Sequence, residues 1–215
     1  MLFDKYSINS ELMLEELDES FVDEIAALHK NSLSEGIMPA LGNRALVHYY
    51  LYVLKHHSQL LIGAIFRGKL VGFFQLSYTP VRAFSVLCSH PSTLLHIITL
   101  ALFNTKLFIG AIMLLFNHQE KTSSSPEISY IAVCQDFQGQ GIGKRMVEKV
   151  NQLAAASNSS EIITYTSNKV ARTMYEKLFD ARVIATKVIL GKEYWHLSWK
   201  TKGKSKEYVP IETTK

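Results

Sequence analysis

Three glycines stand at alternate positions, Gly139, Gly141 and Gly143, in the stretch QDFQGQGIGKRM that runs from Gln135 to Met146. A glycine has no Cβ atom, so the backbone at these positions can come close to another molecule. A strand-like run precedes the glycines and a helical pattern follows them. The first amides of a helix have no partner within the helix, and the helix dipole adds partial positive charge there. The stretch therefore predicts a site for an anion such as a phosphate.

Two other phosphate-binding loops do not fit this spacing. A P-loop requires GxxxxGK followed by Ser or Thr, but Arg145 follows Gly143-Lys144, and Gln138 stands where the first glycine belongs. A dinucleotide-binding turn requires GxGxxG, and counting from Gly139 places its last glycine at Lys144. Both motifs are excluded.

The segments around the glycines alternate between strand and helix patterns. Residues Gln59 to Thr79 predict two strands joined by a turn at Arg67-Gly68-Lys69. Elsewhere, apolar spacing predicts helices, and runs of β-branched and aromatic residues predict strands. The expected helices are Asp18–His29, a second that Asn43 caps, Ile142–Ala156 and Asn168–Phe179. The other expected strands are Glu11–Leu17, Glu127–Cys134, Glu161–Thr166 and two within Ala181–Lys200, around Gly191-Lys192.

This mixed order of elements predicts helices packed on a central, partly antiparallel sheet. The stretch Ser32–Asn43 holds two glycines and a proline and is expected to be a loop. Asp18 or Ser20 is expected to cap the first helix. The expected apolar side of the last helix consists of Val170, Ala171, Met174, Tyr175 and Leu178.

The glycine stretch also fits the pattern Q/R-x-x-G-x-G/A over residues 138–143, and it resembles the acetyl-CoA-binding motif of GCN5-related N-acetyltransferases, the GNAT superfamily. Asn168, Ala171 and Tyr175, in SNKVARTMYEKLF, resemble that family's N-x-x-A-x-x-x-Y helix. The clear match runs from about Glu127 to Val183. The resemblance implies an N-acetyltransferase that takes acetyl-CoA as co-substrate.

The fold that the resemblance implies is an α/β (α+β), GNAT-like one. Its central sheet is mixed and mostly antiparallel, is flanked by helices, and carries a helical insert between strands 3 and 4. We expect a single domain over residues 1–200, with residues 79–125 as the apolar insert and residues 201–215 as a basic, flexible tail.

The resemblance assigns part of the chain to acetyl-CoA. The turn amides are expected to wrap the pyrophosphate, and the backbone of the preceding strand is expected to pair with the pantetheine arm, with the Val133 amide near the thioester oxygen. Asn168 would contact the pantetheine arm, cap its helix, or do both. The residues so assigned are Ile131, Ala132, Val133, Gln138, Gly139, Gln140, Gly141, Ile142, Gly143, Lys144, Asn168 and Ala171.

Two side chains are candidates for proton transfer in the reaction that the resemblance implies. Tyr175 stays protonated at neutral pH and can give a proton to the departing thiolate; the alternative is a tyrosine of the core. Glu127 stands where some members of the family carry their catalytic base; the alternative is a solvated glutamate at a strand end. Cys134 lies next to the site, but no histidine close in sequence would activate it, so we expect a structural thiol.

The apolar run Leu94 to Phe116 is long enough for a membrane span, but Asn104, Thr105 and Lys106 lie at its centre. A single crossing would also place the strands before and after it on opposite sides of the bilayer. We therefore expect two short helices over the acceptor cleft. They would add core, form a homodimer contact, or lie on a membrane surface.

The composition excludes several classes of protein. A net charge of +4, with no Lys/Arg block in the body of the chain, argues against a nucleic-acid groove. Two cysteines make no disulfide framework, and the eight histidines lack zinc-ligand spacing, so we expect no metal. The N-terminus has acids where a signal peptide needs an apolar run, which favours the cytoplasm.

The amine that accepts the acetyl group stays open at the sequence level. It is expected to sit between the Ser32–Asn43 loop and the insert. The first hypothesis is a small-molecule amine, such as an amino sugar, since the insert resembles that of GNAT members from surface-polysaccharide biosynthesis. The alternatives are a protein lysine or N-terminus, or a non-catalytic module that only binds acyl-CoA.

Overall fold

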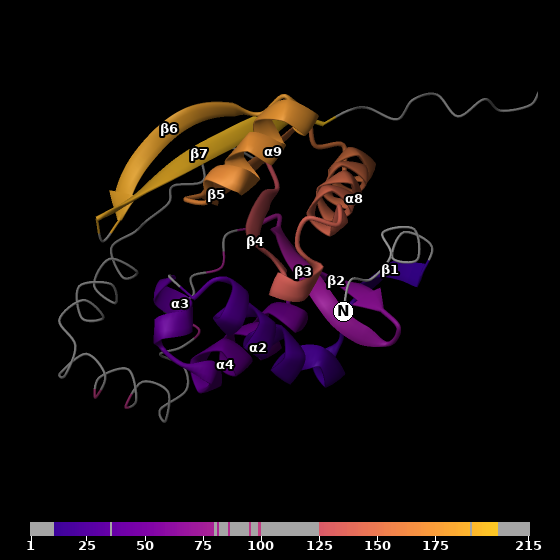
Figure 1. Ribbon diagram of the computed structural model, residues 1–215, viewed down its shortest axis with the longest axis vertical. Helices are drawn as coiled ribbons and strands as arrows, with labels where there is room; N and C mark the ends of the chain where they lie inside the picture. Colours follow the sequence, from indigo (N-terminus) through magenta and orange to yellow (C-terminus); the bar gives the residue numbers. More distant parts are fainter. Residues whose placement is uncertain are drawn as a thin grey trace, which may run out of the picture.

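The computed structural model of the protein describes residues 11–34, 36–79, 81, 86, 95, 99, 125–189 and 191–201. Seven strands form one mixed sheet in the order β1-β2-β3-β4-β5-β7-β6 (Figure 1). All neighbouring strands pair antiparallel except β4 and β5, which are parallel. This confirms the predicted fold class. The strands are β1 Leu12–Glu16, β2 Gln59–Phe66, β3 Lys69–Ser77, β4 Glu127–Val133, β5 Glu161–Thr166, β6 Arg182–Ile189 and β7 Lys192–Lys200.

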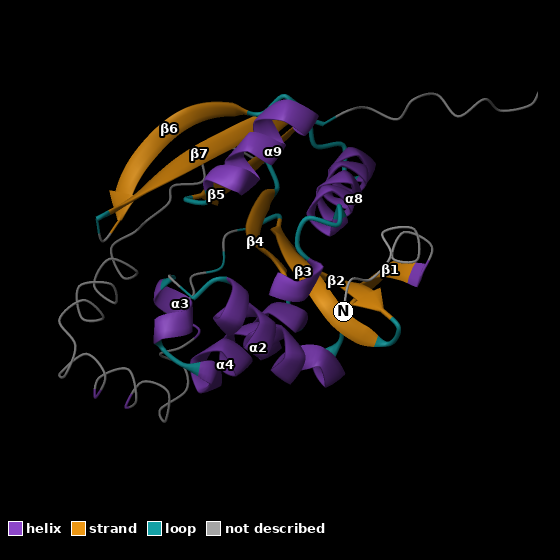
Figure 2. Cartoon of the chain, viewed as in Figure 1, coloured by secondary structure: helices purple, strands orange, loops and turns teal. Residues whose placement is uncertain are grey.

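Helices cover both faces of the sheet (Figure 2). One buried cluster joins α2 and α4 to the sheet, and another joins α8 and α9 to its opposite face. The sheet is therefore the middle layer of the fold. The helices are α2 Val22–Ser32, α3 Ile37–Ala40, α4 Asn43–Leu54, α8 Ile142–Ala156 and α9 Lys169–Phe179, with short 3-10 turns η1 Glu19–Phe21 and η2 Gln135–Phe137.

The predicted caps are right at two helix starts and wrong at one. Asp18 accepts a hydrogen bond from the Ser20 amide and begins η1, and Asn168 caps α9. Asn43 is not the cap of α4, because Gly42 takes the flanking position with a φ of 89° and Asn43 becomes the first helical residue. A left-handed backbone of this kind favours glycine, so the cap moves back by one residue.

Two expectations about helices are corrected. The Ser32–Asn43 stretch contains the one-turn helix α3, since a proline is tolerated in the first turn of a helix. In α9, Val170 is 81% exposed and Leu178 44% exposed, so these two do not lie on the buried side. The buried side chains of α9 are Tyr175 and Phe179, one turn apart. The contact with the sheet is therefore a narrow stripe, while the apolar pattern predicted a broad one.

Most of the predicted insert and the tail beyond residue 201 lie outside the described residues. The domain limits and the role of the insert stay predictions. Within the part of the chain that the structure describes, no helix is both long and apolar enough to cross a membrane.

Candidate active site

A fork between β4 and β5 is the central feature of the site. The two strands pair only at Glu127–Ile163 and Ile128–Thr164, and then they separate. On its other edge β4 stays paired with β3 up to Cys134, whose amide donates to Val71 O at 2.8 Å. Backbone groups alternate between the two edges of a strand, so the amides and carbonyls of Ile131 and Val133 face the open side of the fork. An extended chain could pair with this edge as an added strand.

A β-bulge lies where the fork opens. Gln75 of β3 faces Tyr130, but the next residue, Leu76, faces Ile128, so Ser129 is the extra residue on β4. A bulge of this type bends its strand and re-aims a side chain. Here Ser129 and Tyr130 both line a cavity.

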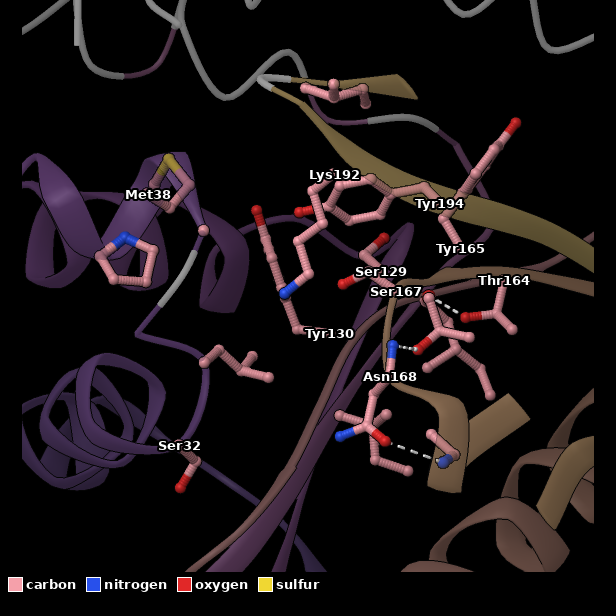
Figure 3. A pocket seen from close by; sticks show the side chains of 18 of the residues that line it. Ser32, Met38, Ser129, Tyr130, Thr164, Tyr165, Ser167, Asn168, Lys192 and Tyr194 are labelled. Atoms are coloured by element: carbon pink, nitrogen blue, oxygen red, sulfur yellow. Dashed lines mark hydrogen bonds between the residues drawn. The ribbon is translucent and has the colours of Figure 1, made fainter. Parts of the chain in front are cut away.

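The cavity has a volume of about 1130 Å³ and occupies the fork (Figure 3). Its walls come from the segment between α2 and α3, from the open part of β4, from the end of β5 with the start of α9, and from the β6–β7 hairpin. The hairpin supplies Lys187, Lys192 and Tyr194, and α2 supplies His29. The Ser32–Asn43 stretch is at this site as predicted from the sequence, whereas His29 and the hairpin were not predicted there.

The glycine turn follows β4 and leads into α8. Gly139 and Gly141 have φ angles of 75° and 87°, and a Cβ atom built at either position meets nothing within 4 Å. Gly141 is the N-cap of α8 and makes no side-chain cap bond. Towards other described residues, the amides from Gly139 to Lys144 donate no hydrogen bond, and the first bond of the helix runs from the Arg145 amide to Gly141 O at 3.1 Å. This turn is an open cradle of amides that fits a diphosphate.

The two glutamines of the turn hold it in shape. Gln138 donates through Nε2 to Val133 O at 3.0 Å, which ties the turn back to the end of β4. Gln140 donates through Nε2 to Asp136 O, also at 3.0 Å. The Lys144 side chain pairs with Glu148 along α8 at 3.7 Å. These side chains therefore brace the turn while its amides stay open.

Asn168 and Ala171 both line the cavity at the start of α9. The Asn168 Oδ1 atom accepts from the amides of Val170 at 2.8 Å and Ala171 at 3.1 Å. The oxygen of Asn168 is thus used as a helix cap, and its NH₂ group is the part that could contact a ligand. Figure 3 shows Asn168 on the wall opposite Ser32 and Met38.

Tyr175 is 1% exposed and also lines the cavity. Its ring stacks on Trp199 with the ring centroids 5.4 Å apart. Burial raises the pKa of the Tyr175 phenol above its usual value, while a hydrogen bond with Thr164 acts in the opposite direction. The phenol is therefore protonated at neutral pH, as a proton donor must be.

Glu127 lies at the paired end of the fork and is not among the residues that line the cavity. Its charge contributes to the raised pKa values of Tyr130 and Tyr165, although burial of each phenol is the larger cause. Glu127 therefore lies near the tyrosines of the cavity. Its role as a base stays a prediction.

His29 is a buried histidine that no sequence motif marks. It is 1% exposed, and its Nδ1 atom lies 2.5 Å from the Tyr50 hydroxyl. Burial lowers the pKa of His29 to about 4, so its imidazole is neutral at pH 7. Its ring centroid is 4.5 Å from that of Tyr130. The signal that could have found it is its place on the buried face of α2.

Comparisons with known proteins agree with this geometry. A model of the acetyltransferase (GNAT) family matches residues 87–180. No curated protein sequence matches the chain. Within the described residues there is also no group of three or more His, Cys, Asp or Glu side chains that could hold a metal ion.

Solved structures with the same fold cover nearly the whole chain. The PaiA N-acetyltransferase from Thermoplasma acidophilum, solved with coenzyme A, has a TM-score of 0.57 at 11% identity and covers 88% of this chain and 98% of its own. The ribosomal-protein-S18-alanine N-acetyltransferase from Escherichia coli has a TM-score of 0.57 at 10% identity, over 92% and 98%. An aminoglycoside 6'-acetyltransferase type Ii has a TM-score of 0.56 at 12% identity, over 88% and 97%. At such low identities these likenesses show the fold.

Proposed function

We propose that this chain is an acyl-CoA-dependent N-acetyltransferase of the GNAT superfamily, and that it moves the acetyl group of acetyl-CoA onto a primary amine of a small molecule. The match of residues 87–180 to a model of the acetyltransferase (GNAT) family and the likeness of the fold to a solved N-acetyltransferase support this proposal. An amino sugar is the first candidate for that amine. The observation that carries the proposal is the fork between β4 and β5, with a cavity inside it and a turn of open amides at the end of β4.

The donor half of the site uses backbone groups. The amides of the turn from Gly139 to Lys144 would bind the diphosphate, as charge and dipole favour at a helix start. The open edge of β4 at Ile131, Ala132 and Val133 would pair with the pantetheine arm, and Asn168 and Ala171 would flank it. Acetyl-CoA supplies the reactive thioester.

The transfer needs an acid and a base. The amine nitrogen attacks the thioester carbonyl, a C–N bond forms, and the C–S bond breaks. Tyr175 would give its proton to the departing thiolate, since its phenol is protonated and the residue lines the cavity. Glu127 would take the proton that the amine loses. A neutral amine is the reactive form, and a sugar amine needs less help from a base because it is less basic than a lysine.

The walls of the cavity favour a small, hydroxylated acceptor. Serine, threonine and tyrosine hydroxyls are common in the lining, and none of its described residues is acidic. Hydroxyl groups and aromatic faces suit a sugar, whereas a cationic peptide would need carboxylates. The β6–β7 hairpin also encloses the site. A homodimer and contact with a membrane surface stay predictions that depend on residues 79–125.

The test is a screen for thiol release from acetyl-CoA with a panel of amines. The panel holds amino sugars, simple alkylamines, amino acids, and peptides that present a lysine or an N-terminal alanine. We expect release with at least one small amine and identification of the N-acetyl product by mass spectrometry. Transfer to peptides alone would contradict the small-molecule proposal. Binding of coenzyme A without transfer to any amine would favour a non-catalytic module.

A further inference from the structure

A buried hydrogen-bond network ends at the Ser129 hydroxyl. Gln59, Gln75 and Ser77 of β2 and β3 are 6%, 0% and 1% exposed. Gln75 donates through Nε2 to Gln59 Oε1 at 3.0 Å, and Ser77 donates to the same oxygen at 2.5 Å. Ser77 Oγ lies 2.7 Å from Ser129 Oγ. The network therefore connects the interior of the sheet to the bulge in the cavity wall.

The direction of each bond in this network follows from one fixed point. Gln59 donates through Nε2 to the Thr79 carbonyl at 2.7 Å, and a carbonyl can only accept. The Gln59 Oε1 atom must then be the acceptor that faces Gln75 and Ser77. Gln75 Oε1 is left to accept from the Tyr49 hydroxyl at 3.2 Å, so the assignment is consistent throughout.

The same reasoning sets the direction of the Ser129 hydroxyl. The Ser77 proton is directed at Gln59 Oε1, so Ser77 Oγ acts as the acceptor towards Ser129. The Ser129 proton then points into the sheet, and the lone pairs of its oxygen remain for the cavity that Ser129 lines. Figure 3 shows Ser129 between Tyr130 on one side and Thr164 on the other.

We propose that Ser129 Oγ is the hydrogen-bond acceptor that binds an N–H of the incoming amine and aims its nitrogen at the thioester. This inference rests on the proposed function. Ser129 is the bulged residue, directly after the last pair of β4 and β5, which is where the fork begins. Glu127 faces Ser77 across β3 and β4, so the bound nitrogen would lie on the same face as the candidate base.

The network holds Ser129 in place and does not carry a proton away. A serine proton that moved inward through Ser77 would reach the amide oxygen of Gln59, which also accepts from the side-chain amide of Gln75. Neither group can pass a proton on at neutral pH. Ser129 is therefore a binding group, and the base must be another residue.

The substrates that this arrangement selects are amines that keep at least one N–H while they attack. A neutral oxygen lone pair accepts from an amine or an ammonium, so it holds the acceptor before and after deprotonation. An acceptor that offers an alcohol at the same place also has a proton to donate. Ser129 would therefore bind an alcohol as well as an amine. The greater nucleophilicity of the amine nitrogen would make the amine the substrate that reacts.

The experiment compares steady-state kinetics of Ser129→Ala, Ser129→Thr and Ser77→Ala, with the best amine from the panel as substrate. For Ser129→Ala we expect the KM of the amine to rise and kcat/KM to fall by about tenfold to a hundredfold, with the KM of acetyl-CoA changed by less than about twofold. Ser129→Thr keeps the hydroxyl and should recover most of the activity. Ser77→Ala removes the group that orients Ser129 and should give a smaller rise in the KM of the amine.

The matched control is Ser198→Ala. Ser198 is a buried serine of the same sheet that donates to Glu161 and does not line the cavity. The Ser198→Ala variant should lose thermal stability much as Ser129→Ala does, while its KM values for the amine and for acetyl-CoA stay within about twofold of those of the wild type. The pH profile of kcat/KM should keep its shape in Ser129→Ala, because a binding group does not titrate. An unchanged amine KM and kcat in Ser129→Ala, or a shifted pH profile, would overturn the inference.

A failure of the proposed function looks different. The wild-type protein would then release no thiol with any amine. In that case the role of Ser129 is tested by measuring how tightly glucosamine binds to the coenzyme A complexes of the wild type and of Ser129→Ala. Tighter binding to the wild type than to Ser129→Ala supports the contact. Equal affinities, including no binding to either protein, overturn it.

Discussion

Thr164 of β5 closes the fork with its side chain as well as with its backbone. Its Oγ1 atom donates to Ile128 O at 3.0 Å, at the last position where β4 and β5 face each other. Thr164 is 2% exposed and also lines the cavity next to Tyr175. One threonine hydroxyl thus connects the point where the strands separate to the candidate acid.

Replacing Thr164 by valine should loosen the base of the fork. Valine keeps the branched shape but leaves the Ile128 carbonyl without this donor, which costs about 1 kcal/mol in the free energy of unfolding. We expect a lower kcat/KM for acetyl-CoA as well as lower stability in urea. Thr173→Val is the control, because Thr173 makes the same kind of bond, to Lys169 O at 2.9 Å, on the exposed face of α9. Equal kinetic losses in both variants would contradict the assigned role of Thr164.

Gly141→Val should abolish most of the affinity for coenzyme A. The residue has a φ of 87°, where a side chain costs about 1–2 kcal/mol, and a valine would also fill the space beside the open amides. Isothermal titration should show a loss of about tenfold or more in affinity, with the fold retained. Gly68→Val matches the strain, since Gly68 has a φ of 73° and open space around it in the β2–β3 turn, outside the glycine motif. Gly68→Val should therefore lose stability and keep its affinity.

The parts of this site that lie close together in sequence could be predicted from it. The glycines, the strand before them and the helix after them form one continuous segment, so their spacing alone indicated an anion site. The same holds for Asn168 as the cap of α9. Each of these features depends on backbone preferences within a few residues.

The fork itself could not be derived from patterns in the sequence. Whether β4 and β5 pair over two residues or six depends on register and twist, which no run of residue types specifies. The bulge at Ser129 depends in the same way on the register between β3 and β4. The expectation that this strand receives the pantetheine arm came only from the family resemblance.

Residues that reach the cavity from distant elements were missed for a related reason. His29 and Tyr194 are separated by most of the chain and meet the same cavity only through the sheet order β4-β5-β7 and the packing of α2. The spacing of apolar residues likewise predicted that α9 has an apolar side, but it did not predict how wide the contact between α9 and the sheet is. Val170 and Leu178 are exposed because only a narrow stripe of α9 meets the sheet.

Tyr175→Phe should slow turnover by about a hundredfold with little change in affinity for coenzyme A. Phenylalanine keeps the ring that stacks on Trp199, so the fold should be retained. Because burial raises the pKa of the Tyr175 phenol, the wild type should lose no activity through this group between pH 7 and its ordinary pKa of 10. Tyr78→Phe is the control, since Tyr78 packs against the same core outside the cavity and its hydroxyl lies 3.5 Å from Leu153 O. Full activity of Tyr175→Phe would show that Tyr175 is a tyrosine of the core.

Protein stability should fall in mild acid because of His29. Its pKa is about 4 in the folded protein and 6.5 in the ordinary, unfolded state, so the unfolded chain binds more protons between these values. The free energy of unfolding therefore rises with pH across this window, and it decreases as the pH drops from about 6.5 to about 4, by roughly 3 kcal/mol in total. Above pH 6.5 the contribution is constant.

Urea unfolding of the wild type and of His29→Gln at pH 7 and at pH 4.5 measures this contribution. Glutamine does not titrate, so the loss of stability between the two pH values should be smaller in the variant. Burial also lowers the pKa of His196, with Lys187 as a second cause, and this histidine contributes in the same direction in both proteins. The difference between the two losses therefore isolates His29. An identical loss in the wild type and in His29→Gln would mean that the buried imidazole, held by Tyr50, is not what makes the fold sensitive to acid.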